Sequence, residues 1–203
     1  TRLDGIELIL DGYHGDVFTN PSALLRQQYA EVIEEDRLIT RDLDSLRSLP
    51  CETLDGHQLP LWVNTGLLAD VQRAQQRGAE GVGLYRSEVA FMGTSRFPSE
   101  SEQVEMYRQQ LEAFHPLPVT MRTLDIGGDK PLSYFPIKET NPYLGWRGIR
   151  VTLDHPEIFS VQVRAMIKAS AGLNNLSILL PMISGVDELE DAQQLIQRAW
   201  HEL

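Results

Sequence analysis

The chain has 203 residues, of which 42% are hydrophobic and 23% are charged, a composition typical of a globular protein with one good core. Its formal net charge of -11 argues against binding to nucleic acid or anionic lipid, because both need a positive footprint. Cys51 is the single cysteine and forms no internal disulfide, and no apolar run approaches the roughly 20 residues that span a bilayer. These features predict a cytoplasmic protein without membrane insertion, in which a few well-placed arginines would have to hold any anionic ligand.

The N-terminal segment predicts a hairpin and then a long helix. An apolar run at residues 6–10, a glycine-containing turn and residues 17–18 suit two strands. Beyond Pro21, apolar residues recur with a 3-4 alternation in a segment free of Gly and Pro, and this predicts one helix that ends near Pro50. Because an isolated hairpin is marginal in water, we expect residues 1–20 to be the tail of a neighbouring domain and residues 21–50 to be a linker helix.

From residue 55 onward, predicted strands and helices alternate. The helix at residues 100–114 follows Ser99, with Glu102 as the partner in a capping box, and a second box at Asp154 and Glu157 is expected to open a later helix. The strands are predicted at residues 61–63, 82–85, 119–124 and 176–182, and the other helices at residues 67–76, 154–172 and 186–199.

Four successive strand and helix units predict an α/β fold with a parallel sheet. Residues 61–203 are a little over half of the roughly 250 residues of a typical TIM barrel. We therefore expect the N-terminal part of a (β/α)8 barrel, with an open doubly wound sheet as the alternative.

Two arginines stand at the ends of predicted strands. Arg86 directly follows the strand at residues 82–85, and Arg122 lies within residues 119–124. Parallel α/β folds bind ligands where strands end, and a guanidinium presents a fork of donors that matches phosphate or carboxylate oxygens. Either arginine alone is well explained by an ion pair with a structural carboxylate. Two of them at adjacent strand ends favour an anion site.

A turn with paired glycines follows the second arginine. Gly127 and Gly128 allow positive φ and a close backbone approach to a ligand, although a plain tight turn is the commoner explanation. Asp125 and Asp129 flank this turn, and carboxylates of this kind can hold a hard cation. A salt bridge or a loop-capping role is the favoured interpretation of both.

Three motifs in the same order and spacing resemble Enzyme I of the bacterial phosphotransferase system. They are GAEGVGLYRSE at residues 78–88, RTLDIGGDK at residues 122–130 and NPYLGWRGIR at residues 141–150. The match continues through LPMI at residues 180–183, while residues 1–50 are similar to the end of the family's phosphohistidine domain and its linker helix. The RFPSE stretch at residues 96–100 is more similar to the nitrogen-related paralogue of Enzyme I than to the sugar-transport form.

The resemblance implies that phosphoenolpyruvate binds at the barrel mouth with Mg²⁺. A histidine of the N-terminal domain then takes the phosphoryl group and passes it to a small HPr-like carrier protein, in an enzyme expected to be a homodimer. Arg86 and Arg122 match the family's arginines that hold the substrate phosphate. The supporting residues are Arg147, Asp125, Gly127 and Gly128.

The family's phosphoryl-accepting histidine would precede residue 1, and its Mg²⁺ carboxylates and proton-donating cysteine would follow residue 203. We therefore expect a fragment that contains no catalytic residue and no metal ligand, is inactive alone and associates through its open sheet edges. A phosphoenolpyruvate synthase or pyruvate phosphate dikinase, which share the barrel and the arginines, is an alternative. The loop at residues 126–130 favours Enzyme I. A binding module without catalysis is the other alternative.

Overall fold

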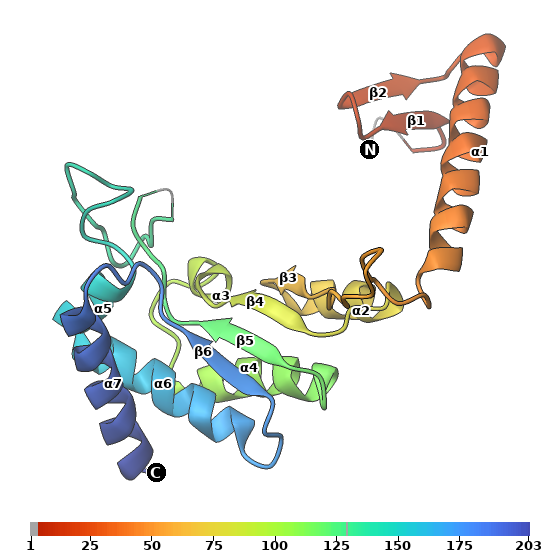
Figure 1. Cartoon of the computed structure of the whole chain (residues 1–203). Coiled ribbons are helices and arrows are strands. Elements are labelled where there is room, and N and C mark those ends of the chain that lie inside the picture. Colours follow the sequence, from red (N-terminus) through yellow and green to blue (C-terminus); the bar gives the residue numbers. More distant parts are fainter. Residues whose placement is uncertain (1–3, 129) are drawn as a thin grey trace. The chain divides into compact units, whose positions relative to one another are not determined.

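The computed structural model describes residues 4–128 and 130–203 (Figure 1). They belong to two compact units, an N-terminal unit that ends at Pro50 and a C-terminal unit that begins at Cys51. No helix in the described ranges is long and apolar enough to cross a membrane.

The N-terminal unit contains the expected hairpin and helix. Strands β1 (Leu8–Asp11) and β2 (Asp16–Thr19) pair in antiparallel register, and α1 (Ala23–Leu46) follows. The hairpin packs on the helix through Tyr29, whose ring centroid lies 5.7 Å from that of Phe18 and whose hydroxyl donates to Asp11 Oδ2 at 2.7 Å. The secondary structure is confirmed here, and the assignment of this unit to a phosphohistidine domain and linker stays a prediction.

A four-stranded parallel sheet with the order β3-β4-β5-β6 forms the centre of the C-terminal unit. Its strands are β3 (Val63–Thr65), β4 (Val82–Arg86), β5 (Val119–Arg122) and β6 (Leu176–Leu179). The α/β class and the parallel sheet are therefore confirmed. In the described part of the chain β3 and β6 are the edges of this sheet, so no closed barrel is seen.

Helices cover one face of this sheet (Figure 1). The long ones are α2 (Leu68–Gln76), α4 (Glu100–Phe114), α6 (Pro156–Ser170) and α7 (Val186–His201). Apolar side chains from β4, β5, α4 and α6 meet in the main core, which includes Val82, Met121, Tyr107 and Met166. Because side chains alternate across a strand, Asn64, Ser177 and Leu179 point away from these partners and are exposed.

Two short helices were not predicted, namely α3 (Glu88–Met92) and α5 (Ile149–Asp154). The expected capping box at Asp154 is wrong, because α6 begins at Pro156 with His155 as its N-cap, and the Asp154 carboxylate accepts a hydrogen bond from Trp146 Nε1 at 2.6 Å. The box at Ser99 is confirmed, since Ser99 and Glu102 bind each other's backbone N–H groups.

Strand ends also differ from the expected ones. The first strand lies at Val63–Thr65 instead of residues 61–63, and the third and fourth end at Arg122 and Leu179. The residues after Arg122 and Leu179 leave the sheet earlier than their apolar character predicts, and they form loops at its carboxyl edge.

Candidate anion site at the carboxyl edge of the sheet

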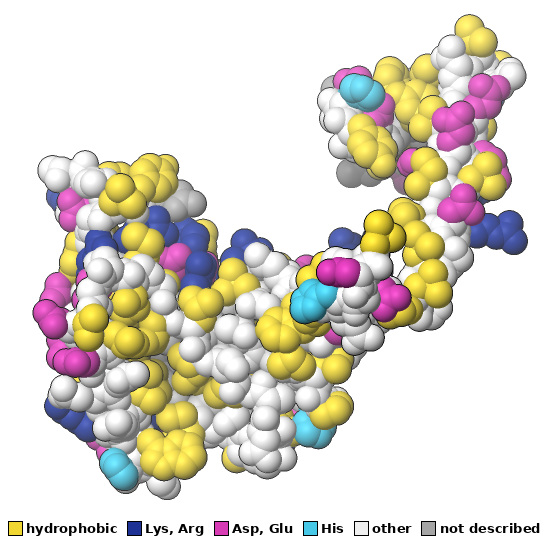
Figure 2. All heavy atoms as spheres, in the orientation of Figure 1, with side chains coloured by type: hydrophobic (Ala, Val, Ile, Leu, Met, Phe, Trp, Pro, Cys, Tyr) yellow, Lys and Arg dark blue, Asp and Glu magenta, His cyan; other side chains and the backbone are white. Residues whose placement is uncertain are grey.

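The strand register places the two predicted arginines side by side. Arg86 is the last residue of β4 and Arg122 the last residue of β5, and their Cα atoms are paired across the two strands. Both stand at the carboxyl edge, where parallel sheets bind ligands. Figure 2 shows Lys and Arg side chains gathered over this part of the C-terminal unit.

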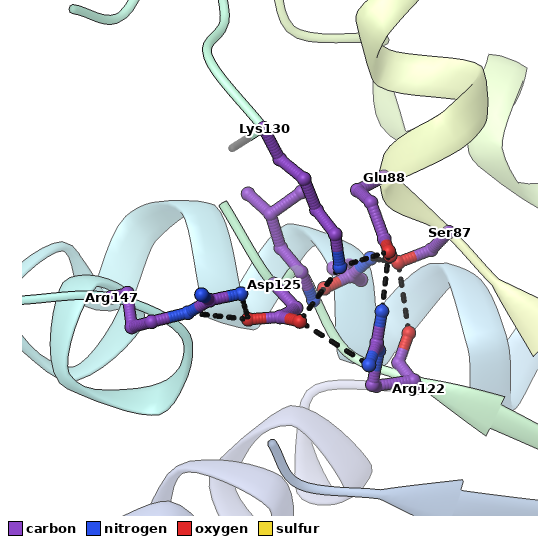
Figure 3. Close-up of polar contacts among 8 residues, drawn as sticks. Ser87, Glu88, Arg122, Asp125, Lys130 and Arg147 are labelled. Carbon is purple, nitrogen blue, oxygen red and sulfur yellow. Dashed lines mark hydrogen bonds and ion pairs between the residues drawn. The ribbon is translucent and has the colours of Figure 1, made fainter. Parts of the chain in front are cut away.

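Arg122 belongs to a closed ring of ion pairs with Glu88, Lys130 and Asp125 (Figure 3). Its Nη2 donates to Glu88 Oε1, and its Nη1 lies 3.2 Å from Asp125 Oδ2. Lys130 Nζ donates to the same two oxygens, at 2.9 Å to Glu88 Oε1 and at 3.0 Å to Asp125 Oδ2. Each carboxylate therefore bridges both cations, and we call these four residues the ion-pair ring.

Arg147 binds the ring from the outside. Its Nη2 and Nε donate to Asp125 Oδ1 at 3.1 and 3.4 Å. The side chains are 1% exposed at Glu88, 5% at Asp125, 9% at Arg147, 15% at Arg122 and 21% at Lys130. Three cations thus contact the carboxylates of Glu88 and Asp125 in a largely buried group, and such cations can bind an anionic ligand.

Neighbouring charges set the ionisation of the site. Burial disfavours the charged form of Asp125, but the hydrogen bond from Lys130 and the charges of Arg122 and Lys130, together with the bond from Arg147, outweigh it and lower the pKa of Asp125. Burial and the charge of Glu88 raise the pKa of Tyr85 to about 12, so the tyrosine adds no charge at neutral pH.

Buried hydrogen bonds fix the backbone on both sides of Arg122. Ser87 Oγ donates to the carbonyl of Arg122 at 2.8 Å, and Gln162 Nε2 donates to Ser87 Oγ at 3.1 Å. The backbone N–H of Leu124 donates to Gln162 Oε1 at 2.7 Å. Gln162 lies on α6 and is fully buried, so one amide side chain ties the ends of β4 and β5 to the helix layer.

The paired glycines let the loop after β5 fold tightly against Arg147. A Cβ at Gly127 would lie 2.7 Å from Arg147 Cβ, and a Cβ at Gly128 would lie 2.9 Å from the carbonyl oxygen of Pro142. Both glycines have positive φ, and the turn closes with the N–H of Lys130 donating to the carbonyl of Gly127 at 3.1 Å. The close approach that these glycines permit is thus an approach of the loop to Arg147 and Pro142 of the same chain. The turn also brings Lys130 within hydrogen-bond distance of Asp125.

Arg86 differs from Arg122 in its surroundings. It is exposed, and the described residues offer it no hydrogen bond or ion pair. The structure therefore brings Arg122, Asp125 and Arg147 into direct contact, with Gly127 and Gly128 packed beside them, and places Arg86 next to this group without joining it.

Sequence reasoning missed Glu88, Lys130, Ser87 and Gln162 as site residues. Glu88 and Lys130 carried a signal, because both follow strands that end at the carboxyl edge. Gln162 carried none, since a glutamine within an amphipathic helix looks like any solvated residue.

The described residues do not fit a metal ion. No three His, Cys, Asp or Glu side chains come together within residues 4–128 and 130–203 in a group that could hold one. Asp125 is surrounded by Arg122, Lys130 and Arg147, so its salt-bridge role is the one observed. Asp129, the other candidate, lies outside the described residues.

Comparison with known proteins shows what this arrangement resembles. Residues 40–203 match the family described as PEP-utilising enzyme, PEP-binding domain. The chain is 46% identical over 196 residues to the phosphoenolpyruvate-dependent phosphotransferase system protein of Salmonella typhimurium, covering 97% of this chain and 26% of that protein. It is 42% identical over 204 residues to the phosphoenolpyruvate-protein phosphotransferase of Haemophilus influenzae, covering 98% of this chain and 35% of that protein.

The protein of the same name from Bacillus subtilis is 40% identical over 197 residues, covering 97% of this chain and 34% of that protein. The chain thus spans from about a quarter to about a third of the length of these relatives. The matched region includes Arg86, Arg122 and the whole ion-pair ring. Because this match covers most of the chain, the chain belongs to the family described as PEP-utilising enzyme, PEP-binding domain.

Proposed function

We propose that this chain supplies the phosphate-holding residues of a longer phosphoenolpyruvate-protein phosphotransferase. In that protein the phosphoryl group of phosphoenolpyruvate passes to one of the enzyme's own histidines and then to an HPr-like carrier. The observation that carries the proposal is the pairing of Arg86 and Arg122 at the carboxyl edge of the sheet, beside the ion pairs that hold Arg122 in place.

The arginines suit the chemistry because phosphoryl transfer asks a protein mainly for positioning and charge stabilisation. An imidazole nitrogen attacks phosphorus in line, the bond from phosphorus to the enol oxygen breaks, and the enolate of pyruvate leaves and is later protonated. Arg86 and Arg122 would donate to the phosphoryl oxygens, while Arg147 and Asp125 support Arg122. Donors fixed before the reaction stabilise the charge of the transition state without reorganisation.

Three further parts of the proposal rest on the resemblance. Mg²⁺ is expected as a cofactor whose ligands are not among the described residues. A (β/α)8 barrel would be completed by further strands, which agrees with the exposure of Asn64, Ser177 and Leu179 on the face of the sheet opposite the helices. The longer protein is expected to be a cytoplasmic homodimer, and its assignment to the nitrogen-related branch stays a prediction.

Phosphoenolpyruvate labelled with ³²P tests the function in the full-length protein. We expect acid-labile label on a histidine, stoichiometric pyruvate and no need for a nucleotide. A nucleotide requirement would indicate the synthase or dikinase alternative, and binding without label transfer would indicate a binding module. The names of the relatives above favour the phosphotransferase.

A further inference from the structure

Glu88 is almost fully enclosed, yet it carries a charge that its position penalises. Its side chain is 1% exposed, and its Oε2 has no hydrogen-bond partner in the described part of the protein. A buried carboxylate oxygen without a partner is destabilising, so its presence needs an explanation. The other oxygen of the same carboxylate, Oε1, binds both Arg122 Nη2 and Lys130 Nζ. These two contacts are the reason that we give for the burial of Glu88.

Arg122 is held at both of its terminal nitrogens. Nη2 donates to Glu88 and Nη1 contacts Asp125, while Nε is buried without a partner among the described residues. A guanidinium has five N–H groups, so one N–H on each Nη remains for a ligand. Those two N–H groups have fixed directions only while both carboxylates are in place.

We propose that Glu88 is a positioning residue, whose carboxylate holds Arg122 and Lys130 in the geometry that receives a phosphoryl group. The inference rests on the proposed function above. Asp125 alone does not replace Glu88, because Asp125 lies three residues from Arg122 and five from Lys130, on the same segment of chain. Glu88 begins α3 directly after β4, so its carboxylate holds the two cationic side chains from a different segment of the chain.

Loss of the Glu88 charge has two separable effects. Glu88→Gln removes one negative charge from beside Arg122 and Lys130, so the attraction of the site for an anionic substrate does not weaken. The amide binds the two cations less strongly than the carboxylate does, so Arg122 and Lys130 are less well aligned. Misplacement by about 1 Å can lower a rate roughly 100-fold. We therefore expect kcat to fall about 10- to 100-fold, with the KM for phosphoenolpyruvate unchanged or lower.

Three variants of the full-length enzyme test this inference. Glu88→Gln is compared with Glu112→Gln, a matched control that removes a carboxylate from an ion pair with Arg108 on the exposed side of α4. Lys130→Met removes a cation from the partly exposed side of the ring, so kcat should fall and KM should rise. A KM that rises in Lys130→Met but not in Glu88→Gln distinguishes positioning from a general loss of structure, and kcat is expressed per folded molecule.

A kcat of Glu88→Gln within threefold of the wild-type value, or a raised KM at unchanged kcat, would overturn the inference. If Glu88→Gln does not fold, an unchanged kcat in Lys130→Met would overturn it equally. If the wild-type enzyme takes no phosphoryl group from phosphoenolpyruvate, the proposed function fails instead. In that case crystal structures of wild type and Glu88→Gln decide, because the inference requires the Arg122 guanidinium to move.

Discussion

Arg86 and Arg122 occupy paired positions on neighbouring strands, yet the carboxylates of the described residues hold Arg122 and not Arg86. Arg122 is fixed by Glu88 and Asp125, whereas Arg86 is exposed and is bound by no side chain in the described part of the molecule. The edge thus combines one donor set that is oriented in advance with one that is able to adapt to a ligand. This asymmetry separates the expected effects of the two arginines.

In the full-length enzyme, Arg86→Ala and Arg122→Ala should each lower autophosphorylation by about 10³ or more, because charge-assisted contacts strengthen in the transition state. Sequence alone predicts an intact fold for both variants. The ion-pair ring changes this expectation for Arg122, whose loss leaves buried carboxylates with fewer partners and should lower the free energy of unfolding by about 3 kcal/mol at most, since Lys130 remains. Urea denaturation measures the free energy of unfolding of both variants. A loss of stability in Arg86→Ala as large as that in Arg122→Ala would contradict this expectation.

The contribution of Asp125 to stability should depend on pH. Its pKa is lowered in the folded protein, so the stabilisation is complete above the unfolded pKa of about 4 and is lost as pH falls through the folded value. The unfolding free energy of Asp125→Asn should therefore differ most from that of wild type at pH 7, and this difference should shrink as the pH falls. Unfolding free energies at pH 7 and at successive values below pH 4 measure this, and a constant difference would show that Asp125 is not ionised in the ring.

Gly127→Ala should disturb the loop after β5. The new Cβ would lie 2.7 Å from Arg147 Cβ at a φ of 117°, so both strain and overlap oppose it, at roughly 2 kcal/mol or more. Gly93→Ala is the matched control, because Gly93 has a helical φ of -80° and its added Cβ would meet only the Ala90 carbonyl oxygen, at 3.6 Å. Equal melting temperatures for the two variants would rule out the tight packing described here.

Gln162→Leu should test the buried connection beneath the site. The substitution leaves the Leu124 N–H without its partner, which destabilises by about 1 to 3 kcal/mol. It also removes one of the two hydrogen bonds of the Ser87 hydroxyl, which still donates to the Arg122 carbonyl. We expect a lower melting temperature and a reduced kcat, because both groups flank Arg122. A variant with full stability would mean that water or another side chain satisfies these groups.

The sequence predicted well what depends on neighbouring residues or on the common direction of strands. The Ser99 and Glu102 capping box is local, and Arg86 and Arg122 meet because parallel neighbours end at the same edge. The Asp154 box failed because Trp146 binds that carboxylate.

The position of Glu88 after a strand end was visible in the sequence, but its contact with Arg122 was not, since the two residues lie 34 positions apart and the contact depends on strand register. Gln162 was equally hidden, because the groups that it binds lie directly after β4, on α4 and on the segment after β5.

The turn at Gly127 also affects the order in which the site assembles during folding. Arg122, Asp125 and Lys130 lie within nine consecutive residues, so their contacts close short loops at a small entropic cost. The bond from Arg122 to Glu88 must close a segment of 34 residues, and it waits for β4 to dock beside β5. The ion pairs of Asp125 with Arg122 and Lys130 can therefore form while the sheet is incomplete. The ion pairs of Glu88 form only after the two strands are in register.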